Sequence, residues 1–395
     1  MKEIKDIIVI GAGPVGSYTA YQLAKAGIDV SVIEEHPIPG EPASCTGVIG
    51  TKAFDEFDLP KESILNKVKN IKFISPSGNE YLYEPEATQA FVVDRRMFDY
   101  KLMRQAQKKG AEYILGTRVS DINLMKNCVE LDVKSAEGEH KVKTKVAVIA
   151  TGYNYKLTKK LGLGQPPRFL NGAQIETKAA DIEQTEIYFG SHVAPGSFAW
   201  AVPLNNKQAR IGLTTDNDAA FYLRRMLKSK YFTKRVIDGE NAKIILDNIA
   251  LGTIPKSFLA RILVVGEAAG QVKSTTNGGV LYGLCCSKIA AEVIKKAFKS
   301  SNFSEKLFSE YEKKWQRKYG LEIKIGYYFR KIVSELSDAQ IDKLFEISKG
   351  PTVINTLKKK SNFDMHKDLV LFLLKNKTYR DIVWQGFWET LDFRR

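Results

Sequence analysis

The feature that most restricts the fold of this chain is a glycine-rich turn directly after a short apolar run near the N-terminus. Ile7 to Ile10 are all apolar, as expected for a strand buried on both faces of a parallel sheet. Gly11, Gly13 and Gly16 follow with the spacing Gly-x-Gly-x-x-Gly, and a helix is predicted from Tyr18 to Ala26. Such glycines permit a tight turn, close approach of a pyrophosphate, and close packing of helix on strand. The segment predicts a dinucleotide-binding unit; the alternative is a glycine turn in an unrelated α/β protein.

An acidic residue stands where this prediction requires one. Glu34 ends the second predicted strand, Val30 to Ile33, and lies 18 residues after Gly16. A carboxylate there can bind the ribose hydroxyls while the phosphates lie at the helix N-terminus.

A second glycine-rich segment indicates which dinucleotide is bound. The apolar run Leu263 to Val265 ends in Gly266, Glu267 and two alanines. This region resembles that of flavin hydroxylase-like proteins, where an acid, usually Asp, binds the ribityl chain of FAD; Glu267 is one methylene longer. A helix is predicted from Gly278, and its free N–H groups would face the flavin pyrimidine edge. The alternative is an ordinary capped helix.

Two further positions are candidates for cofactor contacts. Arg95, at the start of a predicted helix, could hold a phosphate or a ribityl oxygen, or it could simply form a charge pair at the helix start. The backbone of Val119 could meet the adenine edge. Because the sequence contains no second Gly-x-Gly-x-x-Gly turn, we expect no dedicated NAD(P)H domain.

Composition restricts the partners and the compartment. With 60 Lys and Arg against 45 Asp and Glu, the formal charge is +15, which favours anionic partners. No basic block is long enough to predict a nucleic-acid-binding tail, and we expect no metal site. The four cysteines form no Cys-x-x-Cys pair, and no apolar run is long enough to span a bilayer. We expect a cytoplasmic protein without a signal peptide.

The order of patterns along the chain predicts an α/β fold with a Rossmann-like FAD domain, an inserted antiparallel β-sheet substrate domain and a C-terminal helical region. Short alternating strands fill residues 165–255, and helical patterns fill residues 303–395. The predicted domains are 1–70, 91–165 and 255–300 for FAD, 71–90 and 166–254 for the antiparallel sheet, and 301–395 for the helices.

Together these motifs resemble the geranylgeranyl reductase family of the hydroxylase-like flavoproteins, and within it the archaeal digeranylgeranylglycerophospholipid reductases. Three stretches are specific: a Cys-containing loop at Pro42–Val48, an aromatic-x-Trp-x-x-Pro strand at Phe198–Pro203, and C-terminal helices from Tyr311 to Asp338. The chain departs from the family pattern at Glu267, at Asn277, where Gly is usual, and at Phe198, where Tyr is usual.

The resemblance and the glycine turns together imply the residues that bind FAD. They are Gly11, Gly13, Val15, Gly16, Glu34, Cys45, Thr46, Gly47, Val48, Arg95, Val119, Gly266, Glu267, Gly278, Gly279 and Val280.

The resemblance also implies the chemistry, which is reduction of isolated prenyl double bonds. Such an alkene lacks a carbonyl to stabilise charge, so a proton must be supplied while reduced flavin delivers hydride. Trp200 and Phe198 would line the substrate cavity, where aromatic faces stabilise positive charge. Cys45 could relay the proton or shape the cavity; the alternative is a small buried hydrophobic residue.

The expected partners are a prenylated lipid, an external electron donor (NAD(P)H or ferredoxin, undecided) and, peripherally, an anionic membrane surface. The apolar run Leu369 to Leu374, flanked by lysines, could enter the interface, as could Trp384, Phe387 and Trp388; alternatively these residues pack on the larger domains. Rival functions on the same scaffold are a flavin monooxygenase, an electron carrier to quinone, and a flavin-binding protein without turnover.

Overall fold

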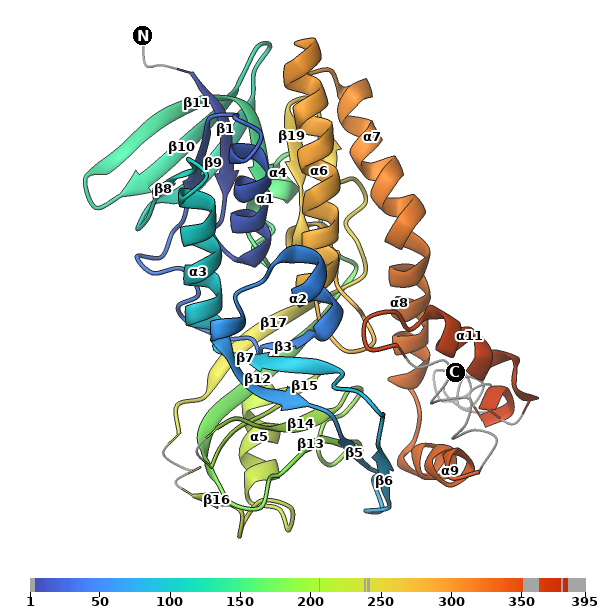
Figure 1. The fold of residues 1–395 in the computed structure, drawn as a ribbon. Coiled ribbons are helices and arrows are strands. Elements are labelled where there is room, and N and C mark those ends of the chain that lie inside the picture. The colour runs from blue at the N-terminus through green and yellow to red at the C-terminus, as the bar shows by residue number, and fades with distance from the viewer. Residues whose placement is uncertain are drawn as a thin grey trace.

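The computed structural model describes residues 4–205, 207–237, 239, 242–350, 362–377 and 379–382. Two large sheets lie end to end, with helices along one side of the molecule (Figure 1). A small three-stranded sheet, in the order β3-β7-β4, lies where the two meet. Its strands are β3 (Val48–Gly50), β4 (Ile64–Val68) and β7 (Ala90–Val93).

The first sheet has the strand order β18-β19-β11-β1-β2-β8, and its central strands are parallel. The path comprises β1 (Lys5–Ile10), β2 (Val30–Ile33), β8 (Glu112–Ile114), β11 (Gly138–Ile149), β18 (Phe258–Leu259) and β19 (Ile262–Val264). An antiparallel extension of β9 (Arg118–Leu124) and β10 (Val129–Ser135) continues from β11. The predicted parallel sheet and the α/β fold class are confirmed.

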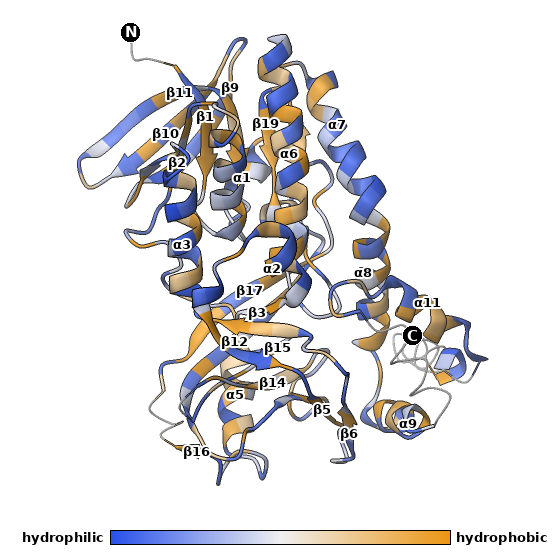
Figure 2. Ribbon diagram, viewed as in Figure 1, coloured by the Kyte–Doolittle hydropathy of each residue, from blue (hydrophilic) through white to orange (hydrophobic). Residues whose placement is uncertain are grey.

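Alternation along β1 explains how this sheet is covered. Ile7 and Val9 point to one face, where they pack against α1 (Pro14–Ala24), α3 (Arg95–Gln107), α6 (Val280–Ser300) and α7 (Glu305–Trp315). Ile8 and Ile10 point to the other face, towards β9, β10 and α4 (Lys156–Lys160). Figure 2 shows hydrophobic residues on β1 and β19 and hydrophilic residues on the outside of α3 and α7. The first helix begins at Pro14, four residues before the predicted Tyr18, because proline fits the first turn of a helix.

The second sheet is largely antiparallel, in the order β16-β12-β15-β14-β13-β5-β6, with β17 also paired to β12. Its strands are β5 (Ile71–Ile74), β6 (Glu80–Tyr83), β12 (Arg168–Ala179), β13 (Thr185–Tyr188), β14 (Ala199–Pro203), β15 (Gln208–Thr215), β16 (Val236–Ile237) and β17 (Ile245–Leu251), and α5 (Ala219–Leu227) packs on one face. β5 and β6 form an antiparallel hairpin within residues 71–90, and β5 also pairs with β13, far away in the sequence.

The C-terminal helices connect the two sheets. Figure 1 shows α7 and α8 (Leu321–Val333) as one rod that passes from the first sheet towards the second, with a π-helical segment, Gln316–Gly320, between them. Beyond α8 come α9 (Asp338–Ser348) and α11 (Lys367–Lys375), and α11 packs against α8. A short helix, α2 (Thr51–Phe57), follows β3. Within the described residues, no helix is both long and apolar enough to cross a membrane. Trp384, Phe387 and Trp388 lie outside the described residues.

A buried ion pair ties the segment before α11 to the loop before α6. Lys273 Nζ lies 3.0 Å from Asp364 Oδ1, and both side chains are less than a tenth exposed. Lys273 also donates to the carbonyl of Phe363, and the hydroxyl of Tyr282 donates to the carbonyl of Asp364. Loss of one partner would leave the other charge buried without compensation.

We therefore predict that Asp364→Ala lowers the free energy of unfolding by about 3–5 kcal/mol, as is usual when one member of a buried pair is removed. Urea unfolding followed by circular dichroism measures this. Glu139→Ala, which removes an exposed partner of Lys134, is the control and should leave the unfolding midpoint nearly unchanged. Equal midpoints for Asp364→Ala and the unmodified protein would contradict the prediction.

Candidate active site

A cavity of about 1340 Å³ lies where the two large sheets and the C-terminal helices meet. At one end it is lined by the glycine turn and strand ends of the first sheet. At the other it is lined by aromatic residues of the second sheet and by residues of α8, α9 and α11. All of the sequence-predicted site residues line this cavity except Gly16 and Gly266.

Each glycine of the turn meets a different structural requirement. Gly11 has φ +107°, which side chains rarely adopt. A Cβ on Gly16 would lie 2.0 Å from the carbonyl oxygen of Gly11, so this glycine allows helix and strand to pack. A Cβ on Gly13 would meet nothing within 4 Å. The helix that starts here has no side-chain cap, so its first N–H groups are available at the cavity.

Gly266 likewise serves packing. A Cβ there would lie 2.9 Å from Val15 Cγ1, and a Cβ on Gly283 would lie 2.3 Å from Val15 Cγ2. Val15 is therefore held between the end of β19 and the helix α6. The hydroxyl of Ser287 adds a hydrogen bond to the carbonyl of Val15, at 3.2 Å. These contacts bring the two glycine-rich segments to one place.

Glu34 lies at the cavity with a fixed carboxylate. Its Oε2 accepts a hydrogen bond from the N–H of Ala12 at 2.7 Å, and its Oε1 accepts one from the N–H of His36 at 2.9 Å. The His36 ring nitrogen Nδ1 lies 2.7 Å from the same Oε1. Because Oε2 has a second lone pair, it can still accept a hydrogen bond from a ligand hydroxyl.

Arg95 is held by a neighbour on its own helix. Its Nε and Nη2 donate to the two oxygens of Asp99 at 3.1 and 2.9 Å, whereas Asp94 caps the helix instead. Burial opposes the charge of Arg95, but the Asp99 carboxylate and the Cys45 thiol together raise its pKa. Arg95 thus remains a cation at the cavity.

Two carboxyl groups from different parts of the fold lie near Arg95. Glu267 belongs to a short 3-10 helix, Gly266–Ala269, and burial together with the Asp247 carboxylate raises its pKa to about 7. Burial also raises the pKa of Asp247, which comes from β17 and was not found by sequence reasoning. Near neutral pH a substantial fraction of Glu267 is therefore protonated, and the protonated carboxyl can donate a hydrogen bond as well as accept one.

The second helix N-terminus at the cavity is that of α6. Its N-cap, Gly279, makes no side-chain hydrogen bond. Asn277, just before this N-terminus, has φ +62°. Asparagine tolerates this left-handed conformation better than most residues, so the turn keeps its shape. Two uncapped helix N-termini therefore open on one cavity, which suits the negative groups of a dinucleotide cofactor.

The cysteine loop faces the same space. Cys45 is exposed and lines the cavity, and its Sγ accepts a hydrogen bond from the N–H of Gly47 at 3.3 Å. The hydroxyl of Thr46 and the indole N–H of Trp200 both donate to Gln174 Oε1, at 2.8 and 3.2 Å. Gln174, on β12, was missed by sequence reasoning because it belongs to no motif.

The far end of the cavity is aromatic. The ring centroids of Phe198 and Trp200 are 6.0 Å apart, and Phe189 lies 6.4 Å from Phe198 and 5.9 Å from Phe345 of α9. Leu369 and Leu373 of α11 complete this wall, whereas Leu371 is exposed. The predicted apolar run at 369–374 thus has one face in the cavity. An elongated apolar ligand fits such a wall.

Comparison with known proteins is consistent with this geometry. The pyridine nucleotide-disulphide oxidoreductase family matches residues 5–184. Among solved structures, a geranylgeranyl bacteriochlorophyll reductase-like protein of Thermoplasma acidophilum has a TM-score of 0.85 at 21% identity, covering 97% of this chain and 98% of that one. The halogenase PltM in complex with FAD has a TM-score of 0.64 at 15% identity and covers 97% of this chain and 90% of that one. These likenesses show the flavoprotein fold.

Closer relatives are found by sequence. The digeranylgeranylglycerophospholipid reductase of Methanocaldococcus jannaschii is 31% identical over 88% of this chain and 91% of that protein. Digeranylgeranylglycerophospholipid reductase 1 of Methanosphaera stadtmanae is 30% identical over 87% of this chain and 88% of that protein. The resemblance predicted from the motifs is confirmed, and this chain belongs to the digeranylgeranylglycerophospholipid reductase family.

Proposed function

We propose that this chain is an FAD-dependent reductase that saturates isolated double bonds of geranylgeranyl chains on prenylated glycerophospholipids. The observation that carries the proposal is a single cavity in which two uncapped helix N-termini face one end and an aromatic wall forms the other. The first end suits a dinucleotide, and the second suits a prenyl chain.

FAD would be held by backbone and side chains of the predicted set. The N–H groups after Gly13 would bind the pyrophosphate, Glu34 the ribose, and Glu267 and Arg95 the ribityl and phosphate oxygens. The backbone of Val119 would meet the adenine, and the loop Cys45–Val48 with the start of α6 would surround the flavin ring. When bound, FAD supplies hydride-transfer chemistry.

The protein would contribute a dry, shaped site and a proton. An isolated alkene needs a proton on one carbon, and positive charge then develops on the other. Cys45 is exposed at the cavity, and its Sγ would hold the proton for delivery. The π faces of Phe198 and Trp200 would stabilise the positive charge and exclude water.

The lipid would reach this cavity from an anionic membrane surface, which the excess of basic residues favours. Retention of the protein on anionic vesicles but not on neutral ones would support that step. The electrons would come from an external donor, NAD(P)H or a ferredoxin.

We predict that Gly13→Ala leaves the fold intact but weakens FAD binding at least about tenfold (about 1.4 kcal/mol), because its Cβ would occupy space left for the pyrophosphate. Flavin titration of the apoprotein measures the affinity, and circular dichroism checks the fold. Gly16→Ala is the matched comparison and should destabilise the protein, because its Cβ would meet the Gly11 carbonyl. Full FAD affinity in Gly13→Ala would argue against this binding mode.

The proposed activity predicts anaerobic turnover. Protein reduced with dithionite should be reoxidised by a digeranylgeranylglycerophospholipid without oxygen, because the alkene itself accepts the hydride. The lipid should gain about two mass units per saturated bond. Visible absorption and mass spectrometry are the measurements. An oxygenated product in air would favour a monooxygenase, and rapid quinone reduction without lipid turnover would favour an electron carrier.

Cys45→Ser should lower the rate of alkene reduction by about a hundredfold at normal flavin content, because a serine hydroxyl is a far weaker acid than a thiol. The rate of anaerobic flavin reoxidation is the measurement. Cys128→Ser changes a buried thiol that does not line the cavity and should have no effect. An unchanged rate in Cys45→Ser would remove the proton-delivery role.

A further inference from the structure

One buried cation of the cavity wall has no part in the proposed chemistry. Arg330 comes from α8, is 5% exposed and lines the cavity. Its guanidinium lies over the ring of Phe198, with the carbon Cζ 5.2 Å from the ring centroid. Its Nη2 donates to the hydroxyl of Ser197, and its Nη1 donates to the carbonyl of Thr275 at 3.4 Å, a long hydrogen bond. Its Nε is buried without a hydrogen-bond partner.

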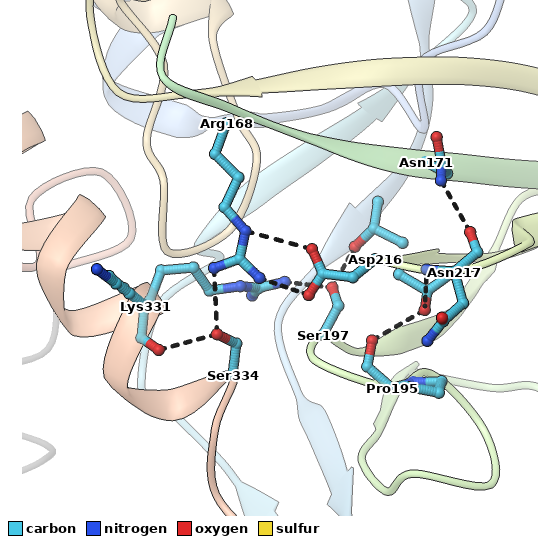
Figure 3. Close-up of polar contacts among 11 residues, drawn as sticks. Arg168, Asn171, Pro195, Ser197, Asp216, Asn217, Lys331 and Ser334 are labelled. Atoms are coloured by element: carbon cyan, nitrogen blue, oxygen red, sulfur yellow. Dashed lines mark hydrogen bonds and ion pairs between the residues drawn. The ribbon is translucent and has the colours of Figure 1, made fainter. Parts of the chain in front are cut away.

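Nothing in the surrounding structure neutralises this charge. Among the described residues no carboxylate lies within ion-pair distance of Arg330. The acid whose charge acts on it, Asp216, is bound by Arg168, whose Nε and Nη2 lie 3.3 and 2.5 Å from the two carboxylate oxygens (Figure 3). Arg168 also donates to Ser334, at the end of α8. The negative charge of Asp216 is thus paired with the positive charge of Arg168, and the charge of Arg330 has no paired anion.

The arginine nevertheless remains charged and fixed in place. Burial lowers its pKa to about 10, which is still well above neutral pH. The hydroxyl of Ser197, which accepts the hydrogen bond from Nη2, is itself hydrogen-bonded to the hydroxyl of Thr214. The side-chain amide of Asn277 donates to the same Thr214 hydroxyl, so the three side chains form a chain of hydrogen bonds. The other end of this chain of hydrogen bonds, Asn277 Oδ1, is also buried without a partner and could accept from a ligand hydroxyl.

A buried, unpaired cation is costly unless an anion joins it. Lys273, a second cation of the wall, already has Asp364 as its partner. Nε and the weakly engaged Nη1 of Arg330 are therefore the donors that remain for an anionic ligand. A guanidinium suits phosphate oxygens in particular, because its planar donors form charge-assisted hydrogen bonds to them.

We infer that Arg330 binds the phosphate of the lipid head group and so makes the enzyme prefer prenylated phospholipids to uncharged prenylated lipids. The inference rests on the proposed function, since it assigns a specificity residue to the same site. The aromatic and aliphatic wall next to Arg330 would hold the attached chains, while the phosphate lies against the guanidinium.

The test compares two lipids with the flavin-loaded enzyme: digeranylgeranylglycerophosphate and the uncharged digeranylgeranylglycerol. Wild-type enzyme should have a lower KM for the phosphate. Arg330→Met should raise that KM by about tenfold to a hundredfold, the loss expected for charge-assisted hydrogen bonds, with little change in kcat or in the KM for the uncharged lipid. Arg330→Lys should recover part of the preference, because it keeps the charge but not the planar donors.

Lys331→Met is the matched control, because it removes an equal charge from an exposed neighbour on the same helix and should change neither KM. Flavin content and the flavin midpoint potential are recorded for each variant. If Arg330→Met shifts the potential and slows both lipids alike, Arg330 acts on the cofactor and the inference is overturned.

The wild-type measurement decides the matter even if Arg330→Met does not fold. Equal KM values for the two lipids would overturn the inference and leave the reductase function intact. Failure of both lipids to reoxidise the reduced enzyme would instead count against the proposed function.

Discussion

The close packing of α1 against α6 and the end of β19 is the contact on which the site depends. Val15 fits between Gly266 and Gly283. A side chain in place of either glycine would collide with Val15 and push the two segments apart. A hydrogen bond at 2.9 Å between the hydroxyls of Thr19 and Ser287 joins the same two helices. Because of this contact, two glycine-rich segments separated by most of the chain present their helix N-termini to one cavity.

The sequence predicted those parts of the site that rest on local rules. A glycine turn after a buried strand determines the local path of the backbone, so the sequence could predict that Gly11, Gly13 and Glu34 lie together, and all three line the cavity. The same rules overlooked the packing role of Gly266, because the residue that it accommodates, Val15, is remote in sequence. Nor did they give the helix start at Pro14, since the apolar pattern becomes clear only at Tyr18.

Site residues that are brought into place only by tertiary contacts could not be predicted from the sequence. Gln174 lies in an alternating strand, and only the pairing of β12 with β15 and β15 with β14 brings it to Trp200. Asp247 meets Glu267 because β17 adds to the far side of β12. Arg330 has the sequence context of any surface cation on an amphipathic helix, and its burial follows only from how α8 meets the second sheet.

The distribution of charge divides the cavity into two chemical environments. Near the first sheet, Arg95, Asp99, Asp247 and Glu267 form a dense polar group suited to a hydrophilic cofactor. Near the second sheet the wall is aromatic, with Arg330 as an uncompensated charge.

The family match at residues 5–184 covers most of the first environment, whereas α8, α9 and α11 come later in the chain. A halogenase has the same fold, so the fold alone does not determine which reaction takes place in this cavity. The ion pair of Lys273 with Asp364 joins the two environments, because it binds the segment before α11 to the loop that leads into the α6 N-terminus.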